Sequence, residues 1–534
     1  MPQPAELPDD PEHLKRLVIE GRAALDAARH QIQAAHNQIQ SRDLLIEHLK
    51  LQIEKLRRLR FGRSSEQIDR QIAQLELTLE ELETGAAERV VSTASTPAPT
   101  ARVKQPPVRR PLPGHLPRED HVHSPACQCP SCGGALDRLG DAISEVLEYV
   151  PSHFKVIRHV RPKLRCGHCE LIVQQPAPSR PIARGLAGPG LLAHVIVAKY
   201  ADHLPLYRQS AIFAREGIDL DRSTLADWVG GVSALLDPLI EAIGRHVLAG
   251  EKLHADDTPV PVLSPGRGST KTSRLWTYVR DDRPSGSDAP PAVLFRYSPD
   301  RKGERPCAHL ANFSGMLQAD GYSGFNELYD RGQDPLTEVA CWAHVRRKFY
   351  DLTLSKTSPL AQEALTRIAA LYAIEAEIRG RPSAERAAAR QSRAGPHLDA
   401  LHAWLIQTLM QISKKSELAN AIRYALTRWI ALTRYRDDGR LEIDNNAAER
   451  ALRAVALGRK NYLFAGSDAG GERAASLYTL LGTTKLNNLN PEAYLRHVLE
   501  RIAEHPINRI DELLPWHVDL DKQLDRTIDQ LDQL

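Results

Sequence analysis

Long apolar runs are absent from this sequence. No stretch reaches the roughly eighteen consecutive apolar residues that a membrane-spanning helix needs, so we expect no membrane segment. The first ten residues are acidic and rich in proline, and they lack the apolar region of a signal peptide. These two absences predict a protein that stays in the cytoplasm.

The chain also has little net charge. Its 70 lysines and arginines nearly balance 67 aspartates and glutamates, which leaves a formal charge of +3 over 534 residues. A length of this kind predicts several domains. Because the chain as a whole is not basic, any surface that binds nucleic acid must be local.

Cysteine is scarce, with seven residues in the whole chain, and five of the seven fall between Cys127 and Cys169. Such clustering favours a metal site in a reducing compartment over a disulfide framework. Cys129 and Cys132 form one Cys-x-x-Cys pair, and Cys166 and Cys169 form a second. Four thiolates predict a closed, structural Zn²⁺ site. Cys127 is an alternative ligand to Cys129, and a redox pair or chance clustering is the alternative to zinc.

Strand-like runs at 144–150 and 154–160 lie between the two cysteine pairs, which suits a zinc ribbon over residues 121–175. The preceding residues, 85–120, are rich in proline, alanine and threonine and become basic toward their end. This composition predicts a flexible linker. Its arginines could contact phosphates, although a solvated linker explains them equally well.

A heptad pattern runs through the N-terminal residues 1–84. Apolar side chains recur seven residues apart at Val18, Leu25, Ile32, Ile39, Ile46 and Ile53. This pattern favours a parallel two-stranded coiled coil, and therefore a homodimer or a higher oligomer. The alternative is a helical hairpin that packs on its own domain.

Residues 180–248 are expected to be helical. Two helices, at 206–214 and 223–229, flank a turn that contains glycine, which is the outline of a helix-turn-helix. The DNA contacts predicted here are Arg208 and Arg222. The alternative is a plain helical bundle, with the tryptophan of the second helix in its core.

The periodicity changes at residue 249. The pattern becomes three strands, then helix, strand, helix, strand and helix, with strands expected at 252–263, 274–280, 292–297, 316–319 and 337–342. This order is typical of a ribonuclease H-like fold, a mixed sheet covered by helices. We place this domain at 249–480, with a helical insertion at about 353–440. A helical tail is expected at 481–534.

Three acidic residues form the candidate catalytic site. Asp256 lies on the first expected strand and Asp320 ends the fourth, two strands that are neighbours in such a sheet. Glu449 lies on a later helix that Asp444 and the two asparagines after it would cap. Three carboxylates could hold a pair of Mg²⁺ ions for phosphoryl transfer. The alternatives are a turn role for Asp320 and a surface ion pair for Glu449.

Asp257 follows Asp256 directly. Neighbours on a strand point to opposite faces, so only one of these two carboxylates can face a shared site easily. The local pattern does not choose between them.

Together, the motifs resemble the transposases of the bacterial insertion-sequence-66 family, over nearly the whole chain. The matching segments, besides the two cysteine pairs, are FGRSSE at 61–66, RRPLP at 109–113, HLPLYRQ at 203–209, HADDTP at 254–259, DGY at 320–322, CWAHVRRKF at 341–349, NNAAERALR at 445–453, GRKN at 458–461 and AGSDAGGER at 465–473. The family pattern often has glutamate where this chain has Asp257, which keeps a carboxylate.

The resemblance implies an enzyme of the DDE type, named for its acidic triad. The triad maps onto Asp256, Asp320 and Glu449. Such an enzyme cuts donor DNA at terminal inverted repeats and joins 3′-hydroxyls to target DNA. The resemblance also implies accessory proteins from the same element and a place at the bacterial nucleoid.

Further basic residues are candidate DNA contacts, and they flank the predicted site: Arg346, Arg347, Lys348, Arg453, Arg459 and Lys460. Cys341 is expected to pack in the core, whereas the role of His344 is open. The glycine-rich run 466–471 is expected to form a turn and not a nucleotide-binding loop, because no Gly-Lys-Ser/Thr follows it.

Two other functions remain open at this point. A nuclease on the same fold would cut DNA without joining it. A DNA-binding regulator with a degenerate catalytic domain would do neither, although the presence of all three carboxylates speaks against decay.

Overall fold

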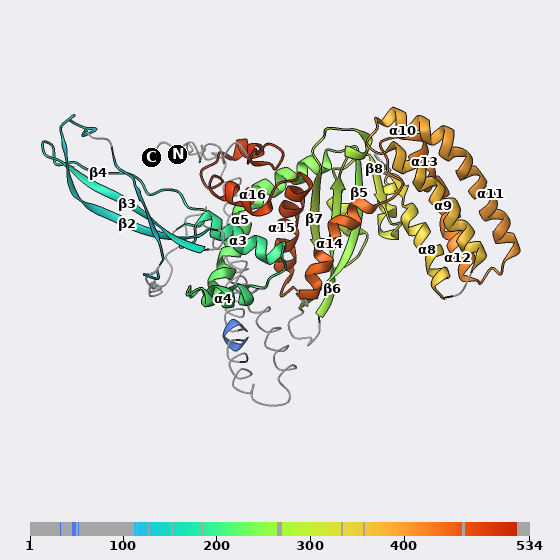
Figure 1. Cartoon of the computed structure of the whole chain (residues 1–534), viewed down its shortest axis with the longest axis horizontal. Coiled ribbons are helices and arrows are strands. Elements are labelled where there is room, and N and C mark those ends of the chain that lie inside the picture. The colour runs from blue at the N-terminus through green and yellow to red at the C-terminus, as the bar shows by residue number, and fades with distance from the viewer. Residues whose placement is uncertain are drawn as a thin grey trace, which may run out of the picture. The chain divides into compact units, whose positions relative to one another are not determined.

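The computed structural model divides the chain into two compact units, Met1–Glu83 and Thr84–Leu534 (Figure 1). The described residues are 33, 45–49 and 52 of the first unit, and 112–520 of the second with gaps at 115, 126–127, 151–152, 184, 264–269, 333–334, 356–357 and 462–464. The predicted coiled coil, most of the predicted linker and Cys127 therefore lie outside the described residues. Within the described part, no helix is both long enough and apolar enough to cross a membrane.

A four-stranded mixed sheet opens the described part of the second unit. Its strands are β1 (Arg118–Val122), β2 (Leu136–Val150), β3 (His153–Cys166) and β4 (Ile172–Gln174). The order is β1-β3-β2, with β4 also paired to β3. The long hairpin of β2 and β3 is antiparallel, and β1 runs parallel to β3. Both hairpin strands extend well beyond the runs predicted from the sequence.

Strand β1 begins inside the segment that the sequence predicted as a linker. All five of its residues are exposed, so apolar burial does not hold it in place. Ion pairs to β3 do: Glu119 lies 2.6 Å from Lys155, and Asp120 accepts from Arg158 at 2.7 Å. Cross-strand pairs of opposite charge stabilise such a strand. Composition alone could not reveal these partners.

Three helices follow: α3 (Pro189–Tyr200), α4 (Leu206–Arg215) and α5 (Arg222–Leu248). The turn between α4 and α5 contains Gly217, whose positive φ of 79° suits glycine. The helix-turn-helix outline is present, but the prediction of a short second helix is wrong. Helix α5 has 27 residues, because its buried face continues past residue 229. Trp228 is 5% exposed and lies in the core.

The second mixed sheet has five strands: β5 (Lys252–Leu263), β6 (Thr270–Arg280), β7 (Ala292–Ser298), β8 (Met316–Ala319) and β9 (Thr337–Ala340). Their order is β7-β6-β5-β8-β9. The first three strands form an antiparallel meander, and β8 and β9 join β5 in parallel. All five predicted strands are confirmed, with small shifts at their ends.

Short helices α6 (Glu304–His309) and α7 (Asn326–Asp330) connect the strands of this sheet. Helices α14 (Asn446–Asn461) and α15 (Asp468–Leu486) lie beside it in Figure 1. The run predicted as a glycine-rich turn instead begins α15, since the Ser467 side chain accepts from the N–H of Gly470 and caps the helix.

Helix α15 packs along the outer strand β7. The hydroxyl of Thr479 accepts from the N–H of Phe295 at 2.8 Å. The hydroxyl of Thr483 accepts from the N–H of Val293 at 3.2 Å and donates to the carbonyl of the same residue at 3.1 Å. Side chains of a helix therefore satisfy three backbone groups of β7: the N–H groups of Val293 and Phe295 and the carbonyl of Val293.

The segment predicted as a helical insertion consists of helices, and it follows helix α8 (Trp342–Ser355). Its helices are α9 (Pro359–Ile378), α10 (Ser383–Ala389), α11 (Gly395–Gln411), α12 (Glu417–Thr427) and α13 (Trp429–Asp437). These helices build a hydrophobic core together with α8 and β9, separate from the core under the rest of the sheet. Buried Arg390 braces it by donating two hydrogen bonds of 2.7 Å to Glu375.

The last described elements are α16 (Pro491–Leu499) and a 3₁₀ helix at Ile507–Leu513. Residues after 520 are outside the described part, so only the first portion of the predicted C-terminal helical tail can be compared.

Candidate active site and zinc site

Asp256 and Asp320 lie at the same level of the central sheet. Strands β5 and β8 are parallel, with Lys252 opposite Met316 and His254 opposite Gln318. The pairing of β5 with β8 ends at His254 and Gln318, and Asp256 and Asp320 each lie two residues beyond that last pair. Both residues are therefore at the same end of these two parallel strands.

The Asp256 carboxylate has an unfavourable electrostatic environment. Burial is the main cause that raises its pKa, to about 7, and the negative charges of Asp320, Asp257 and Glu449 raise it further. The N–H of Asp257 donates to Asp256 at 2.7 Å and offsets part of this effect. A bound cation would relieve the repulsion that these neighbouring charges exert on the Asp256 carboxylate.

Asp257 lies in different surroundings. Its side chain is 2% exposed and is ion-paired with two arginines, Arg274 at 2.9 Å and Arg301 at 2.7 Å. Arg301 also stacks on the ring of Tyr322, 4.0 Å from the ring centre. Asp257 thus fastens β5 to β6 and to the loop after β7. The two ion pairs give Asp257 a structural role.

Asp320 also has the turn role that the sequence offered as an alternative. One of its carboxylate oxygens accepts from the N–H of Tyr322 at 2.9 Å, across Gly321 with its φ of 81°. Its carbonyl accepts from the hydroxyl of Tyr424, on α12 of the insertion, at 2.8 Å. A turn role does not prevent metal binding, because a carboxylate oxygen has more than one lone pair.

Asn445 connects the start of α14 to strand β5. Its side chain is fully buried, and its amide NH₂ donates to the carbonyl of Ala255 at 2.8 Å. Its amide oxygen lies 3.2 Å from Nδ1 of His254, and its backbone carbonyl begins the helix by accepting from Ala448 and Glu449. The sequence marked Asn445 only as a helix cap, and its role as a clamp depends on residues 190 positions earlier in the chain.

Glu449 lies one helical turn after Asn445 and faces His344. Its Oε1 is 3.8 Å from Nδ1 of His344, and both side chains are partly exposed. Within the described part of the chain, Cys341, His344 and Glu449 form a group whose potential ligand atoms all lie within 4.8 Å of one another. The three predicted catalytic carboxylates do not form such a group there. In a two-ion site, carboxylates that hold different ions can lie further apart than this.

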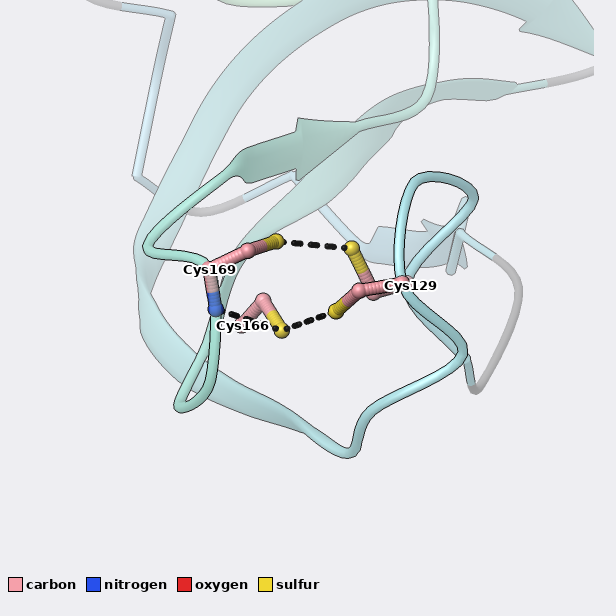
Figure 2. A group of neighbouring side chains, drawn as sticks. Cys129, Cys166 and Cys169 are labelled. Carbon is pink, nitrogen blue, oxygen red and sulfur yellow. Dashed lines mark hydrogen bonds between the residues drawn. The ribbon is translucent and has the colours of Figure 1, made fainter.

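The four predicted zinc ligands come together at the end of the hairpin β2–β3 that is opposite its turn. Sγ of Cys129 is 3.3 Å from Sγ of Cys169, and Sγ of Cys132 is 3.4 Å from Sγ of Cys166. All four sulfur atoms lie within 4.8 Å of one another. Figure 2 shows the labelled cysteines pointing toward one another across the gap between two loops. Tetrahedral zinc with bonds of about 2.3 Å needs such spacings.

Backbone groups prepare one of these sulfur atoms, that of Cys166, for a cation. The N–H groups of His168 and Cys169 point at Sγ of Cys166, and they lower the pKa of that thiol to about 6. A Cβ at Gly134 would lie 3.3 Å from the same sulfur, so a residue without a side chain fits best there. Lowered thiol pKa and a tight loop both favour metal binding.

The predicted DNA contacts are spread over four helices. Arg208 is exposed on α4, and Arg222 is partly buried at the start of α5. Those on α8 and α14 that are exposed are Arg346, Arg347, Lys348 and Arg453. Arg459 and Lys460 belong to the last turn of α14, where side chains are outside the described part.

Comparison with known families identifies the class of protein. Residues 184–473 match the family described as "Transposase IS66 family", and residues 479–516 match the "IS66 C-terminal element". Residues 126–170 match the "zinc-finger binding domain of transposase IS66", and residues 48–120 match "Transposase C of IS166 homeodomain". The chain belongs to the IS66 family of transposases.

Several relatives are known from Sinorhizobium fredii. The protein y4hP is 44% identical over 474 residues, which cover 85% of this chain and 86% of the relative. The protein y4jD is 43% identical over 416 residues, covering 76% of this chain and 81% of that protein. Both are described as uncharacterized, so they support the family and not a particular reaction.

Proposed function

We propose that this protein is a DNA transposase that binds the terminal inverted repeats of its element, cleaves them and joins the 3′-hydroxyl ends to target DNA. The observation that carries the proposal is that Asp256 on β5 and Asp320 after β8 lie equally far beyond the last pair of these neighbouring strands. The clamp at Asn445 supports it, because it ties the helix that bears Glu449 to the same end of β5. The sheet order β7-β6-β5-β8-β9 supports a ribonuclease H-like catalytic domain.

Asp256, Asp320 and Glu449 would hold two Mg²⁺ ions. Carboxylates are the ligands that Mg²⁺ prefers, and a bound cation would counter the effects that raise the pKa of Asp256. When bound, the ions supply activation of the attacking oxygen and stabilisation of the leaving oxygen. The protein's part is to hold the three carboxylates at one edge of a rigid sheet. Asn445 fixes the helix, and the Asp320–Tyr322 hydrogen bond fixes the turn.

Other parts of the chain would hold DNA and pair the subunits. The exposed cations on α8 begin two residues after His344 and are Arg346, Arg347 and Lys348. Arg453 lies one turn beyond Glu449. Phosphates next to the site would meet these side chains. We propose further contacts from the helix-turn-helix at α4 and α5.

The predictions from the sequence on assembly, domain limits and zinc are also part of this proposal. Residues 1–84 form a coiled coil that makes a homodimer or higher oligomer, and accessory proteins of the element assist at the nucleoid. The domain limits predicted from the sequence stand as proposed, with the zinc ribbon extended to begin at β1. Zn²⁺ on the four cysteines stabilises the ribbon.

The proposal is tested with the full chain, Mg²⁺ and DNA that carries the inverted repeats flanking its coding region. Asp320→Asn should abolish cleavage and joining while leaving DNA binding intact. Asp330→Asn is the matched control, because Asp330 is an exposed residue at the end of α7. Strand transfer retained in Asp320→Asn overturns the assignment. Cleavage without joining in the unmodified protein identifies a nuclease instead.

A further inference from the structure

Cys341, His344 and Glu449 bring three kinds of metal ligand together beside the proposed magnesium site. A sulfur, an imidazole nitrogen and a carboxylate oxygen lie within 4.8 Å of one another. They come from two places in the chain, the start of α8 and the first turn of α14. Since Asn445 clamps α14 to β5, the arrangement is held by buried contacts.

The Cys341 sulfur lies in a setting that stabilises a thiolate once a cation is present. It is 2% exposed, and the N–H of Asn445 donates to it at 3.2 Å. The N–H groups of Ala343 and His344, at the start of α8, also point toward it. Burial raises the pKa of the Cys341 thiol to about 12, and these N–H donors, at the positive end of a helix, offset part of that effect.

His344 has a nitrogen that lacks a partner. Its Nδ1 is buried, and among the described residues no group forms a hydrogen bond with it. The Glu449 carboxylate is near, but 3.8 Å is too long for a hydrogen bond. Buried polar atoms without partners are rare and call for an explanation. A metal ion between Nδ1, the Cys341 sulfur and Glu449 would satisfy all three.

We propose that Cys341, His344 and Glu449 bind a borderline divalent ion such as Zn²⁺, at a site distinct from the zinc ribbon. Three protein ligands with one position left for water is a common arrangement for zinc. Mg²⁺ does not occupy this set of three ligands, because Mg²⁺ prefers oxygen and avoids thiolate. Binding displaces the thiol proton of Cys341 to solvent, so the affinity increases with pH.

The site shares Glu449 with the proposed magnesium site, and this gives it a regulatory consequence. Zn²⁺ on Cys341 and His344 holds the Glu449 carboxylate away from Asp256 and Asp320. It therefore inhibits the Mg²⁺-dependent reaction. This consequence rests on the proposed function, whereas the binding of zinc does not.

The binding experiment uses the full chain with its ribbon already loaded with zinc. Added Co²⁺ should give a thiolate-to-cobalt charge-transfer band and bind with about one further equivalent per chain. The band should disappear in Cys341→Ser. His344→Ala should bind Co²⁺ with an affinity that is lower by about tenfold or more. Cys307→Ser is the matched control, because Cys307 is a half-buried cysteine whose sulfur donates to the Glu327 carboxylate. This variant should keep the band.

Two results overturn the proposal: no cobalt–thiolate band in the unmodified protein, or an undiminished band in Cys341→Ser. His344 is partly exposed, so its variant remains informative if the cysteine variant fails to fold.

The inhibitory effect of zinc is tested by measuring strand transfer in Mg²⁺ with and without added Zn²⁺. Zinc should lower the rate of the unmodified protein by about tenfold or more, and His344→Ala should lose that sensitivity relative to its own zinc-free rate. Equal sensitivity in both overturns the regulatory role. Absence of all strand transfer would count against the proposed function, while the cobalt band would still decide the metal site.

Discussion

Asp256 and Asp257 are consecutive residues of β5, and their carboxylates have opposite electrostatic surroundings. Asp257 is ion-paired with Arg274 and Arg301, whereas Asp256 is near Asp320 and Glu449 and has a pKa raised to about 7. One carboxylate stabilises the fold, and the other is held where its own charge is unfavourable. The two carboxylates therefore contribute differently to stability.

This contrast predicts opposite effects of two conservative substitutions. Asp257→Asn should lower the free energy of unfolding by about 3 kcal/mol or more, because two partly buried arginines lose their counter-charge. Asp256→Asn should leave the stability unchanged or raise it in the absence of Mg²⁺, because it removes a buried charge that faces like charges. Urea unfolding of both variants checks this. Equal destabilisation by the two substitutions would contradict the assignment of roles.

The Asn445 clamp predicts a loss of activity that exceeds the loss of stability. Asn445→Ala leaves the carbonyl of Ala255 and Nδ1 of His254 without partners, at a cost of about 1–3 kcal/mol. It also frees the helix that carries Glu449, so strand transfer should fall by about tenfold or more while DNA binding persists. Asn446→Ala is the control, because the Asn446 side chain bonds only to neighbouring Asp444 in the described contacts. An active Asn445→Ala protein would show that the clamp does not position Glu449.

The zinc ribbon should depend on its metal. Cys166→Ser removes a buried sulfur ligand, and we expect loss of the ribbon zinc and fraying of the end of the hairpin β2–β3. Zinc content and limited proteolysis within residues 129–171 measure the two effects. The five-stranded sheet has its own core, so its unfolding transition should persist. A Cys166→Ser protein that retains this zinc in full would argue against the four-cysteine site.

Glu148 joins the ribbon sheet to helix α3. Its carboxylate accepts from the N–H groups of Gly190 at 3.2 Å and Leu191 at 2.7 Å, and a Cβ at Gly190 would lie 2.6 Å from it. Glu148→Ala should cost about 2 kcal/mol, because buried donors at the start of the helix lose their acceptor. Proteolysis between β4 and α3 should become faster. Glu145→Ala, which removes a more exposed pair with Arg118, should cost less than about 1 kcal/mol.

His309 predicts part of the acid sensitivity of the fold. Burial, together with the charges of Arg296 and Arg305, lowers its pKa to about 4, and its Nδ1 lies 3.0 Å from the hydroxyl of Tyr278. The unfolded chain takes up this proton near pH 6.5 and the folded chain does not. Stability is therefore full above pH 6.5 and is lost as the pH falls toward 4, by up to about 3 kcal/mol. The free energy of unfolding of His309→Gln, measured over this range, should fall less steeply than that of the unmodified protein. Parallel curves would show that His309 is already protonated in the fold.

Local patterns in the sequence predicted the strands of the central sheet and the cysteine site, because alternation and Cys-x-x-Cys spacing are encoded within a few residues. The length of α5 was missed because burial against other elements, and not a local signal, decides where that helix ends. Strand β1 depends on ion pairs with β3, and the Asn445 clamp depends on β5. Such contacts between distant segments leave no spacing that a single sequence can display.

The hydrogen bonds between β7 and α15 have a consequence for the order of assembly. The Thr479 and Thr483 hydroxyls that satisfy β7 are 184 and 190 residues downstream of their partners, with the entire helical insertion between them. A growing chain can pair β5, β6 and β7 long before α15 has been synthesised. During that interval β7 is an open strand edge, the kind of surface to which another extended chain can add. Helix α15 therefore covers this edge only late in synthesis, and a chain that stops before residue 468 would keep an exposed strand edge to which another chain can add.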